Sequence, residues 1–249
     1  MNGWQNEEVP VDFMIIGSQH AGALNFYDRL IKHPDIIPAK LREINFFQRG
    51  SSFSKGIDFY HSFFPNREEM LQDIRQTGRK KITGEASPSY LFVRQTPQNI
   101  RRYFSNMKFI VLLREPITRA YLQYQTLRSN GLEQFSDFQD AVENDLYHQY
   151  IARGEYAEQL KNWLKYFDKA QFLIIQSERY FKNPEEVMRE TFDFLKVPYV
   201  AYNADNNHLQ TSRHDDRLLL ESPFYNELSS HYREHNEALY DLLSTRFNW

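Results

Sequence analysis

The residues from Asp12 to Pro34, DFMIIGSQHAGALNFYDRLIKHP, have the types and spacing of an anion-binding site. An apolar run, Phe13 to Ile16, stops at Gly17, and a short loop of small residues leads into apolar residues at helical spacing. A buried strand, a tight turn and a helix bring the N–H groups of the loop and the positive end of the helix together. This stretch therefore predicts a cradle for a phosphate or sulfate group.

The cradle does not match the two best-known nucleotide motifs. Gly17 and Gly22 have the spacing of the glycines in G-x-x-x-x-G-K-[ST], but Ala23 and Leu24 replace its Lys-Ser/Thr pair. G-x-G-x-x-G is absent. A conventional P-loop NTPase or nucleotide kinase is therefore disfavoured, and these residues alone leave open a strand–turn–helix without a ligand.

The surrounding elements indicate how the cradle is positioned. KFIVLL, Lys108 to Leu113, is the strongest strand signal and fits a central parallel strand covered on both faces. Shorter strands are expected at Lys81–Glu85 and Gln171–Gln176. Helical patterns lie between and after them, at Arg67–Gln76, Gly154–Phe167, from Asn183, and at Pro223–Leu243. Strands alternating with helices predict an α/β fold with a parallel sheet, in one domain over residues 1–249.

Composition excludes several classes. The chain has 249 residues and a formal charge of −3, which argues against non-specific nucleic-acid binding. Cysteines are absent, which rules out disulfides, thiolate metal sites and cysteine nucleophiles. No apolar run reaches the roughly 18 residues of a membrane span. We expect a cytoplasmic chain with no nucleic-acid or membrane partner; its oligomeric state is unreadable.

Five segments in order give the chain a family resemblance. They are FMIIGSQHAGALNFYDRL, LREINFF, GEASPSY, KFIVLLREPITRAYLQY, and GEYAEQLKNWLKYF with the stretch FLIIQSERYFKNPEEVMRETFDFL that follows it. Together they resemble the PAPS-dependent sulfotransferases, of the type shared by bacterial enzymes and heparan-sulfate sulfotransferases. The resemblance implies a three-layer α/β sandwich of P-loop-NTPase-like fold. It also implies transfer of a sulfuryl group from PAPS to a hydroxyl or amine, with release of PAP.

By this resemblance the cradle binds the 5′ end of the donor through Ser18, Gln19, His20, Ala21, Gly22, Ala23 and Leu24. The family loop carries a lysine where His20 stands and two threonines where Ala23 and Leu24 stand. An anionic ligand would raise the pKa of His20, which could then act as a protonated donor. The alternative is a catalytically weak or inactive relative that binds PAPS or PAP as a binding module.

Three arginines are candidates for the rest of the nucleotide. Arg114 ends the central strand and corresponds to the family arginine that grips the 3′-phosphate. Leu122 replaces a family serine, and Arg119 could compensate for it or pair with a neighbouring acid. Arg213 loosely matches a late basic loop that covers the nucleotide, or is a solvated loop residue.

The acceptor side is expected around LREINFF and GEASPSY. Glu43 matches the glutamate of the family's K-E-x-x-F-F segment and is the candidate base. Arg42 replaces the lysine and could supply a cation to the leaving group, unless the two residues form a surface pair. The residues expected to contact the acceptor are Asn45, Glu85, Ser87 and Tyr90, with Glu85 as a rival base or a buried structural residue.

No metal site is expected among the eight histidines. Sulfuryl transfer needs no metal where protein cations stabilise the leaving oxygen. The acceptor stays open between a carbohydrate, a lipid, a peptide and a small natural product.

Overall fold

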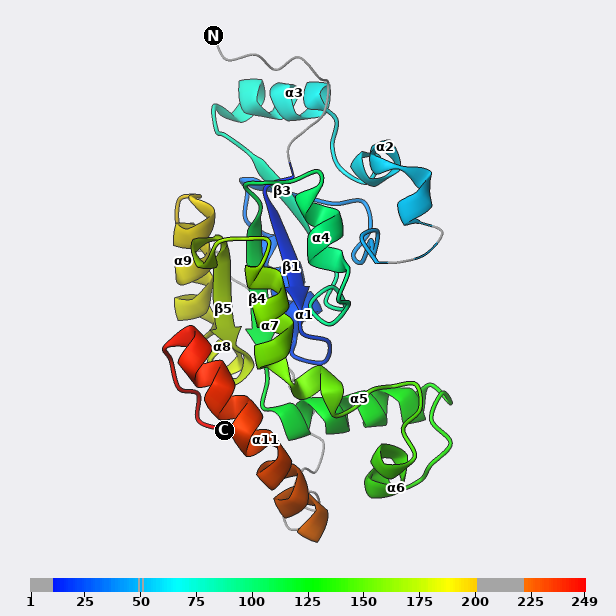
Figure 1. Ribbon diagram of the computed structural model, residues 1–249. Coiled ribbons are helices and arrows are strands. Elements are labelled where there is room, and N and C mark those ends of the chain that lie inside the picture. The colour runs from blue at the N-terminus through cyan, green and yellow to red at the C-terminus, as the bar shows by residue number, and fades with distance from the viewer. Residues whose placement is uncertain (1–10, 49, 51, 201–221) are drawn as a thin grey trace.

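The computed structural model describes residues 11–48, 50, 52–200 and 222–249. A five-stranded, fully parallel sheet in the order β2-β3-β1-β4-β5 forms its centre (Figure 1). The strands are β1 (Phe13–Gly17), β2 (Ile36–Pro38), β3 (Ile82–Ala86), β4 (Lys108–Leu113) and β5 (Phe172–Gln176).

Helices follow or connect these strands. The α-helices are α1 (Ala23–Leu30), α2 (Ile57–His61), α3 (Arg67–Thr77), α4 (Thr96–Arg101), α5 (Pro116–Ser129), α6 (Phe138–Glu143), α7 (Tyr156–Leu164), α8 (Ser177–Lys182), α9 (Pro184–Leu195) and α11 (Pro223–Leu243). Single 3₁₀ turns are η1 (Phe53–Lys55), η2 (Ala152–Gly154) and η3 (Lys169–Gln171). The three-layer α/β fold expected from the sequence is confirmed.

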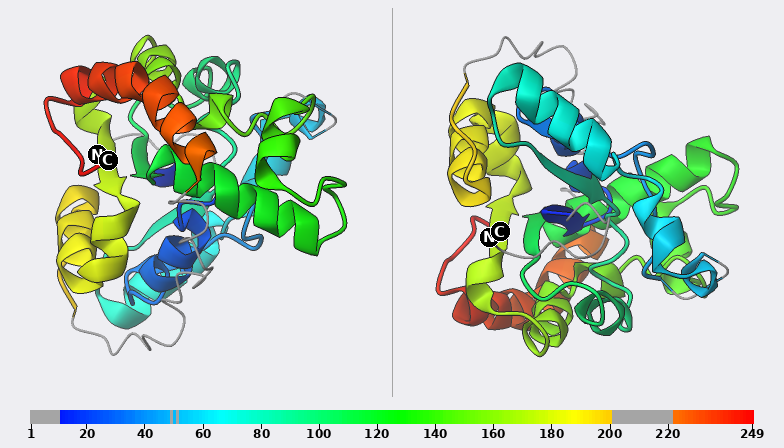
Figure 2. Two further views of the ribbon diagram at one scale, coloured as in Figure 1. Left: turned by 90° about the horizontal axis from the view of Figure 1, so that it is seen from below. Right: turned by 90° about the horizontal axis from the view of Figure 1, so that it is seen from above.

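Alternating side chains of the central strands fill two separate cores. On β1, Met14 and Ile16 face a cluster that includes Trp163 of α7, whereas Phe13 and Ile15 face a cluster that includes Phe26 of α1. Figure 2 shows α1 and α9 on one side of the sheet and α7 and α11 on the other. Because β1 and β4 are covered on both faces, their sequences are continuous apolar runs rather than alternating ones.

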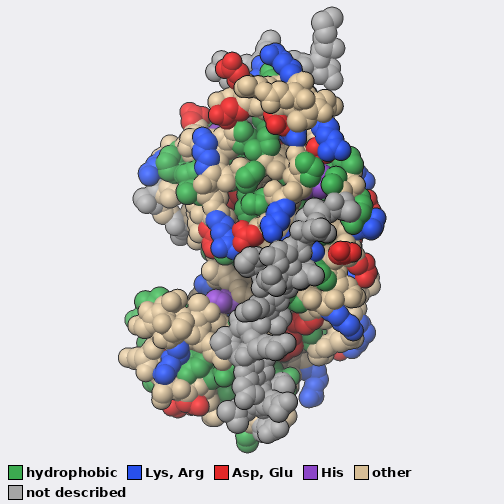
Figure 3. All heavy atoms as spheres, turned by 180° about the vertical axis from the view of Figure 1, so that it is seen from behind, with side chains coloured by type: hydrophobic (Ala, Val, Ile, Leu, Met, Phe, Trp, Pro, Cys, Tyr) green, Lys and Arg blue, Asp and Glu red, His purple; other side chains and the backbone are tan. Residues whose placement is uncertain are grey.

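A third buried cluster lies outside the two sheet cores. It joins α5, α6 and α11 through aromatic residues that include Tyr124, Phe138, Tyr150 and Tyr232. We call this the α5–α6 lobe; it projects below the sheet in Figure 1. In Figure 3 the surface is hollowed between this lobe and the main body, and acidic and basic side chains are interspersed over the face shown.

Within the described residues, no helix has both the length and the apolar character that crossing a membrane requires.

Candidate functional site

The cradle lies at the carboxyl edge of the sheet, where β1 leads into α1. The backbone N–H of Ser18 donates to the carbonyl of Leu112 on β4, at 2.6 Å, which fixes the start of the loop. His20 and Gly22 have φ angles of 64° and 87°. A Cβ on Gly22 would lie 2.6 Å from the Phe181 ring, so this position requires glycine for space as well as for conformation. The loop is therefore held tightly between β4 and α8.

The first turn of α1 supplies free amide donors. Gly22 is the N-cap residue, and no side chain in the described part of the chain caps the helix. The first N–H groups of a helix have no intrahelical partner, so those of Ala23 and Leu24 are available to an anion. The backbone N–H of Ala21 already donates to the carbonyl of Ser18 at 3.2 Å, so the donors that the cradle can offer an anion lie chiefly at Ala23 and Leu24.

Two predicted arginines lie beside this surface. Arg114 follows β4, is 8% exposed, and its Nε lies 3.4 Å from the Ser177 hydroxyl. The same hydroxyl donates to the carbonyl of Ala21 at 2.5 Å, which ties Arg114 to the cradle. Arg119 on α5 is fully buried and donates to the Gln123 amide oxygen at 2.9 Å and to the Tyr150 carbonyl at 2.5 Å.

The turn between the two arginines is rigid because Glu115 caps α5. Its carboxylate accepts from the backbone N–H groups of Ile117 and Thr118, at 3.0 and 2.6 Å. The backbone N–H of Glu115 donates in turn to Glu178 at 2.9 Å. Pro116 occupies the first helical position, where no N–H is needed. The helix that carries Arg119 thus has a fixed start, and the bonds to Gln123 and Tyr150 orient its side chain.

A third cation, Arg153 of η2, was missed by the sequence analysis. Its Nη1 donates to the Gln19 side chain at 2.6 Å, and its guanidinium carbon lies 4.4 Å from the centre of the Phe92 ring. Its Nε donates to the carbonyl of His148 at 3.0 Å. The available signal was a basic residue immediately before the GEYAEQL segment, but 134 residues separate Arg153 from Gln19.

His20 stands among these three arginines. Burial, followed by the charges of Arg119, Arg114 and Arg153, lowers the pKa of His20 to about 3. The imidazole is therefore neutral at physiological pH when the site holds no anion. This lowering of the His20 pKa is opposite to the rise expected beside a bound anion. It reflects the positive charges of the three arginines around the loop as well as burial.

The predicted acceptor residues form a buried hydrogen-bond network around Glu85 on β3. The Glu85 carboxylate accepts from Tyr60, Ser87 and Tyr90 at 2.8, 2.6 and 3.3 Å. Burial raises the pKa of Glu85 to about 7, and these hydrogen bonds act in the opposite direction. Glu85 is fully buried, so its observed contacts are structural.

The same network positions the segment from Glu43 to Phe47. The backbone N–H of Asn45 donates to the Ser87 hydroxyl at 2.9 Å, and that of Phe47 donates to the Tyr90 hydroxyl at 3.3 Å. Glu43 itself is exposed on this anchored segment. Arg42 forms an exposed ion pair with Asp28 of α1 rather than with Glu43.

Not every predicted residue can be placed. Arg213 lies outside the described residues. Leu122, where the family has a serine, is buried on α5 and provides no hydroxyl.

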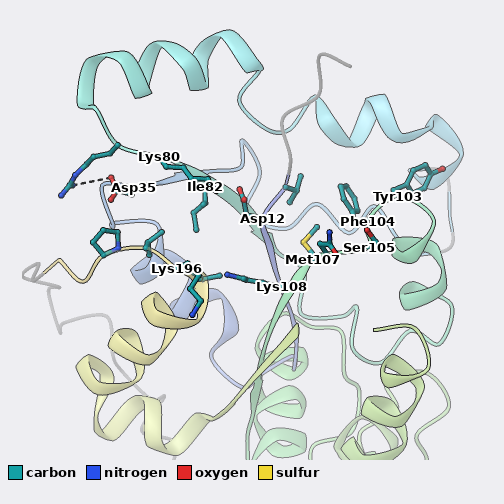
Figure 4. A pocket seen from close by; sticks show the side chains of 16 residues that line it. Asp12, Asp35, Lys80, Ile82, Tyr103, Phe104, Ser105, Met107, Lys108 and Lys196 are labelled. Atoms are coloured by element: carbon teal, nitrogen blue, oxygen red, sulfur yellow. Dashed lines mark ion pairs between the residues drawn. The ribbon is translucent and has the colours of Figure 1, made fainter. Parts of the chain in front are cut away.

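A separate pocket of about 840 Å³ lies at the opposite, amino end of the strands (Figure 4). Asp12 before β1 and Lys108 at the start of β4 mark this end. The charged residues that line it are Asp12, Asp35, Arg79, Lys80, Lys108 and Lys196. Open parallel sheets bind ligands at the carboxyl ends of their strands, where the cradle and the arginines lie. We therefore assign the candidate site to the carboxyl edge.

Comparison with known proteins identifies the family. The model of the sulfotransferase domain matches residues 10–220. The chain belongs to the sulfotransferase domain family. A bifunctional heparan sulfate N-deacetylase/N-sulfotransferase of Drosophila melanogaster is 30% identical over 220 residues, which are 80% of this chain and 20% of that protein. Human heparan sulfate glucosamine 3-O-sulfotransferase 5 is 28% identical over 194 residues, 74% of this chain and 53% of that protein.

Solved sulfotransferases share the fold. The structure of a sulfotransferase from Alicyclobacillus acidocaldarius matches with a TM-score of 0.72 at 23% identity, covering 96% of this chain and 98% of that one. A mouse sulfotransferase complexed with PAP matches with a TM-score of 0.58 at 13% identity, covering 94% and 89%. The matching part of this chain covers 20% of the length of the Drosophila relative and 53% of the length of the human one.

The residues present fit an anionic nucleotide. Among the described residues, the hydrogen-bond partners of Arg119 and Arg153 are neutral oxygens, so neither charge is neutralised by a hydrogen-bonded carboxylate. The Nε of Arg119 is buried without a hydrogen-bond partner in that part of the chain. A buried cation, Arg119, and a half-buried one, Arg153, with neutral partners favour binding of a polyanion such as PAP.

Proposed function

We propose that this sulfotransferase domain transfers a sulfuryl group from PAPS to a hydroxyl or amine of a carbohydrate acceptor and releases PAP. The convergence of Arg114, Arg119 and Arg153 on the His20 loop is the observation that carries the proposal. The names of the relatives, which describe N- and 3-O-sulfation of heparan sulfate, support a carbohydrate acceptor.

The reaction is an in-line displacement at sulfur. The bond between sulfur and the phosphate oxygen of PAPS breaks with its electron pair going to PAP, and a bond forms from the acceptor oxygen or nitrogen to sulfur. The proton lost by the acceptor passes to a base. Catalysis depends on positioning and on cations beside the leaving oxygen.

We assign the leaving-group charge to Arg153, because its guanidinium contacts Gln19 at the loop where the family places a lysine. His20 is neutral before binding, and the negative charges of PAPS favour its protonation, so it serves as a second donor. Arg42 is a further candidate, but its ion pair with Asp28 must first open. Arg114 and Arg119 bind the 3′-phosphate end, with Arg213 as a candidate cover.

Glu43 is the proposed base. Its segment is anchored by Ser87 and Tyr90, whereas its own side chain is exposed and can meet an acceptor. Glu85 is held by three hydroxyl donors and acts as the anchor of that segment rather than as a base. Asn45 lies next to the anchored backbone, where it can orient the acceptor.

The test is PAP release from PAPS with heparan-type oligosaccharides that carry either a free amine or a free hydroxyl. We expect turnover with one acceptor class, and a loss of kcat of about 10²–10⁴-fold in Glu43→Gln with an unchanged Kd for PAP. Asp58→Asn, which alters an exposed acid on α2, is the matched control. Absence of turnover with every acceptor, while PAP still binds, would overturn the enzymatic assignment.

That outcome would favour the second candidate, a domain that binds PAPS or PAP without efficient transfer. The loop supports this candidate because it has Ala23 and Leu24 instead of hydroxyl side chains, and a histidine that is neutral without ligand. His20→Lys distinguishes the two. A large gain in PAP release indicates an impaired native loop, and a loss shows that His20 works in place of lysine.

A further inference from the structure

A second chemical cluster lies between η2 and α11. Glu155, the residue between η2 and α7, meets His231 and His235 of α11. The Nε2 atoms of His231 and His235 lie 3.1 and 3.7 Å from the same Glu155 oxygen. One candidate ligand atom from each of the three side chains falls within 4.8 Å of the others.

The helix places the two histidines together. They are four residues apart in HYREH, so they lie on one face of α11, and their ring centres are 5.0 Å apart. This H-x-x-x-H spacing is visible in the sequence and was overlooked when no metal site was expected. The carboxylate comes from 76 residues away and could not be read from the sequence.

The spacing fits a transition metal. Zinc–nitrogen and zinc–oxygen bonds of about 2.0–2.1 Å in a tetrahedron require ligand atoms about 3.3 Å apart. The two observed nitrogen–oxygen distances, 3.1 and 3.7 Å, bracket that value. Side-chain exposures of 41% for His231, 32% for His235 and 28% for Glu155 leave one side open for entry of the ion and for a water as fourth ligand.

The backbone on both sides of the cluster is already fixed. Tyr232, next to His231, is buried, and its hydroxyl donates to the carbonyl of Ile151 at 2.9 Å. A Cβ on Gly154 would lie 2.7 Å from that hydroxyl and 2.9 Å from Pro116, so η2 and α11 approach closely only because this residue is glycine. A preformed site loses little ordering entropy on binding.

We propose that Glu155, His231 and His235 form a Zn²⁺ site that fastens α11 to the start of α7. Two imidazoles and one carboxylate suit zinc and its transition-metal neighbours, and they disfavour Mg²⁺ and Ca²⁺, which prefer oxygen ligands. The three ligand side chains take no part in the sulfuryl transfer proposed above, although Glu155 lies two residues after Arg153. The alternative is a hydrogen bond between His231 and Glu155 with His235 as a neighbouring ion-pair partner, which needs no metal.

The test uses the full chain without a polyhistidine tag, stripped with a chelator and titrated calorimetrically with Zn²⁺ and, separately, Mg²⁺. We expect one Zn²⁺ per chain, no Mg²⁺ binding, and a rise in Tm of about 5–10 °C at free Zn²⁺ one hundred times its Kd. His231→Ala, His235→Ala and Glu155→Gln should each weaken Zn²⁺ binding at least about tenfold.

His148→Gln is the matched control, because His148 pairs with Glu133 at 3.7 Å without a third described ligand. Its Zn²⁺ affinity should equal that of the unmodified chain. Circular dichroism of each stripped variant checks that it folds. Equal Zn²⁺ affinity in the two alanine variants and the unmodified chain, or absence of Zn²⁺ binding altogether, overturns the proposal. Both results are independent of PAP binding and of sulfuryl transfer.

Discussion

Replacing Glu85 with glutamine should change how the stability of the fold depends on pH. The Glu85 carboxyl has an ordinary pKa of 4.5, and burial raises it to about 7 in the folded protein. The folded state therefore holds this proton more tightly than the unfolded state. The resulting stabilisation is complete below pH 4.5 and is lost as the pH rises through 7.

The magnitude follows from the two pKa values. At 1.36 kcal/mol per unit, this single group should lower the free energy of unfolding by about 2.5 kcal/mol between pH 5 and pH 8. Glu85→Gln keeps the size of the side chain and removes the titration. We therefore expect the free energy of unfolding of the native chain, minus that of the variant, to fall by about 2.5 kcal/mol from pH 5 to pH 8.

Urea unfolding of both chains at half-unit pH intervals measures this difference and cancels the titration of other groups. Glu68→Gln, which removes an exposed carboxylate on α3, is the control, and its difference curve should be much flatter than that of Glu85→Gln. A flat curve for Glu85→Gln as well would refute the account of Glu85 as a buried carboxyl that ionises at a cost.

Three shorter predictions concern the cations and one glycine. Arg153→Met should raise the Kd for PAP, measured by calorimetry, about 10- to 100-fold, because a hydrogen bond to a charged group contributes about 1.5–3 kcal/mol. Arg246→Met is the control: it breaks an exposed pair with Glu237 and should leave that Kd unchanged. Gly154→Ala should cost about 1–3 kcal/mol in urea unfolding because its Cβ meets Tyr232 and Pro116, and a neutral result would contradict the close approach. Arg42→Ala should change stability by less than about 1 kcal/mol, because its pair with Asp28 is exposed, and a larger loss would show that the pair is structural.

The sequence predicts the central elements well because their burial is uniform. The strand at Lys108–Leu113 and the helix at Pro223–Leu243 have the predicted bounds, and the strand before the cradle differs by one residue. A parallel strand covered on both faces is a continuous apolar run, and a helix that begins with proline has a clear start. The position of Arg114 at the carboxyl edge of the sheet could also be predicted, because this residue directly follows the strand Lys108–Leu113.

Contacts between distant segments could not be predicted. Arg153 reaches the cradle from a 3₁₀ turn without periodicity. Tyr60 reaches Glu85 from 25 residues away, whereas Ser87 and Tyr90 belong to the same segment as Glu85. The neutral state of His20 depends on three arginines whose proximity only the fold reveals. The roles of Glu43 and Arg42 stay predictions, since they depend on an acceptor.

The α5–α6 lobe has a consequence for how the anion site is assembled. Arg119 is held by the Tyr150 carbonyl of this lobe, and Arg153 by the carbonyl of His148 just before it, whereas the cradle belongs to the sheet. The two halves become a binding site only after separate cores have joined. We expect nucleotide affinity to emerge late during refolding, after the far-ultraviolet circular dichroism has recovered, so that PAP would act as a probe for the final docking step.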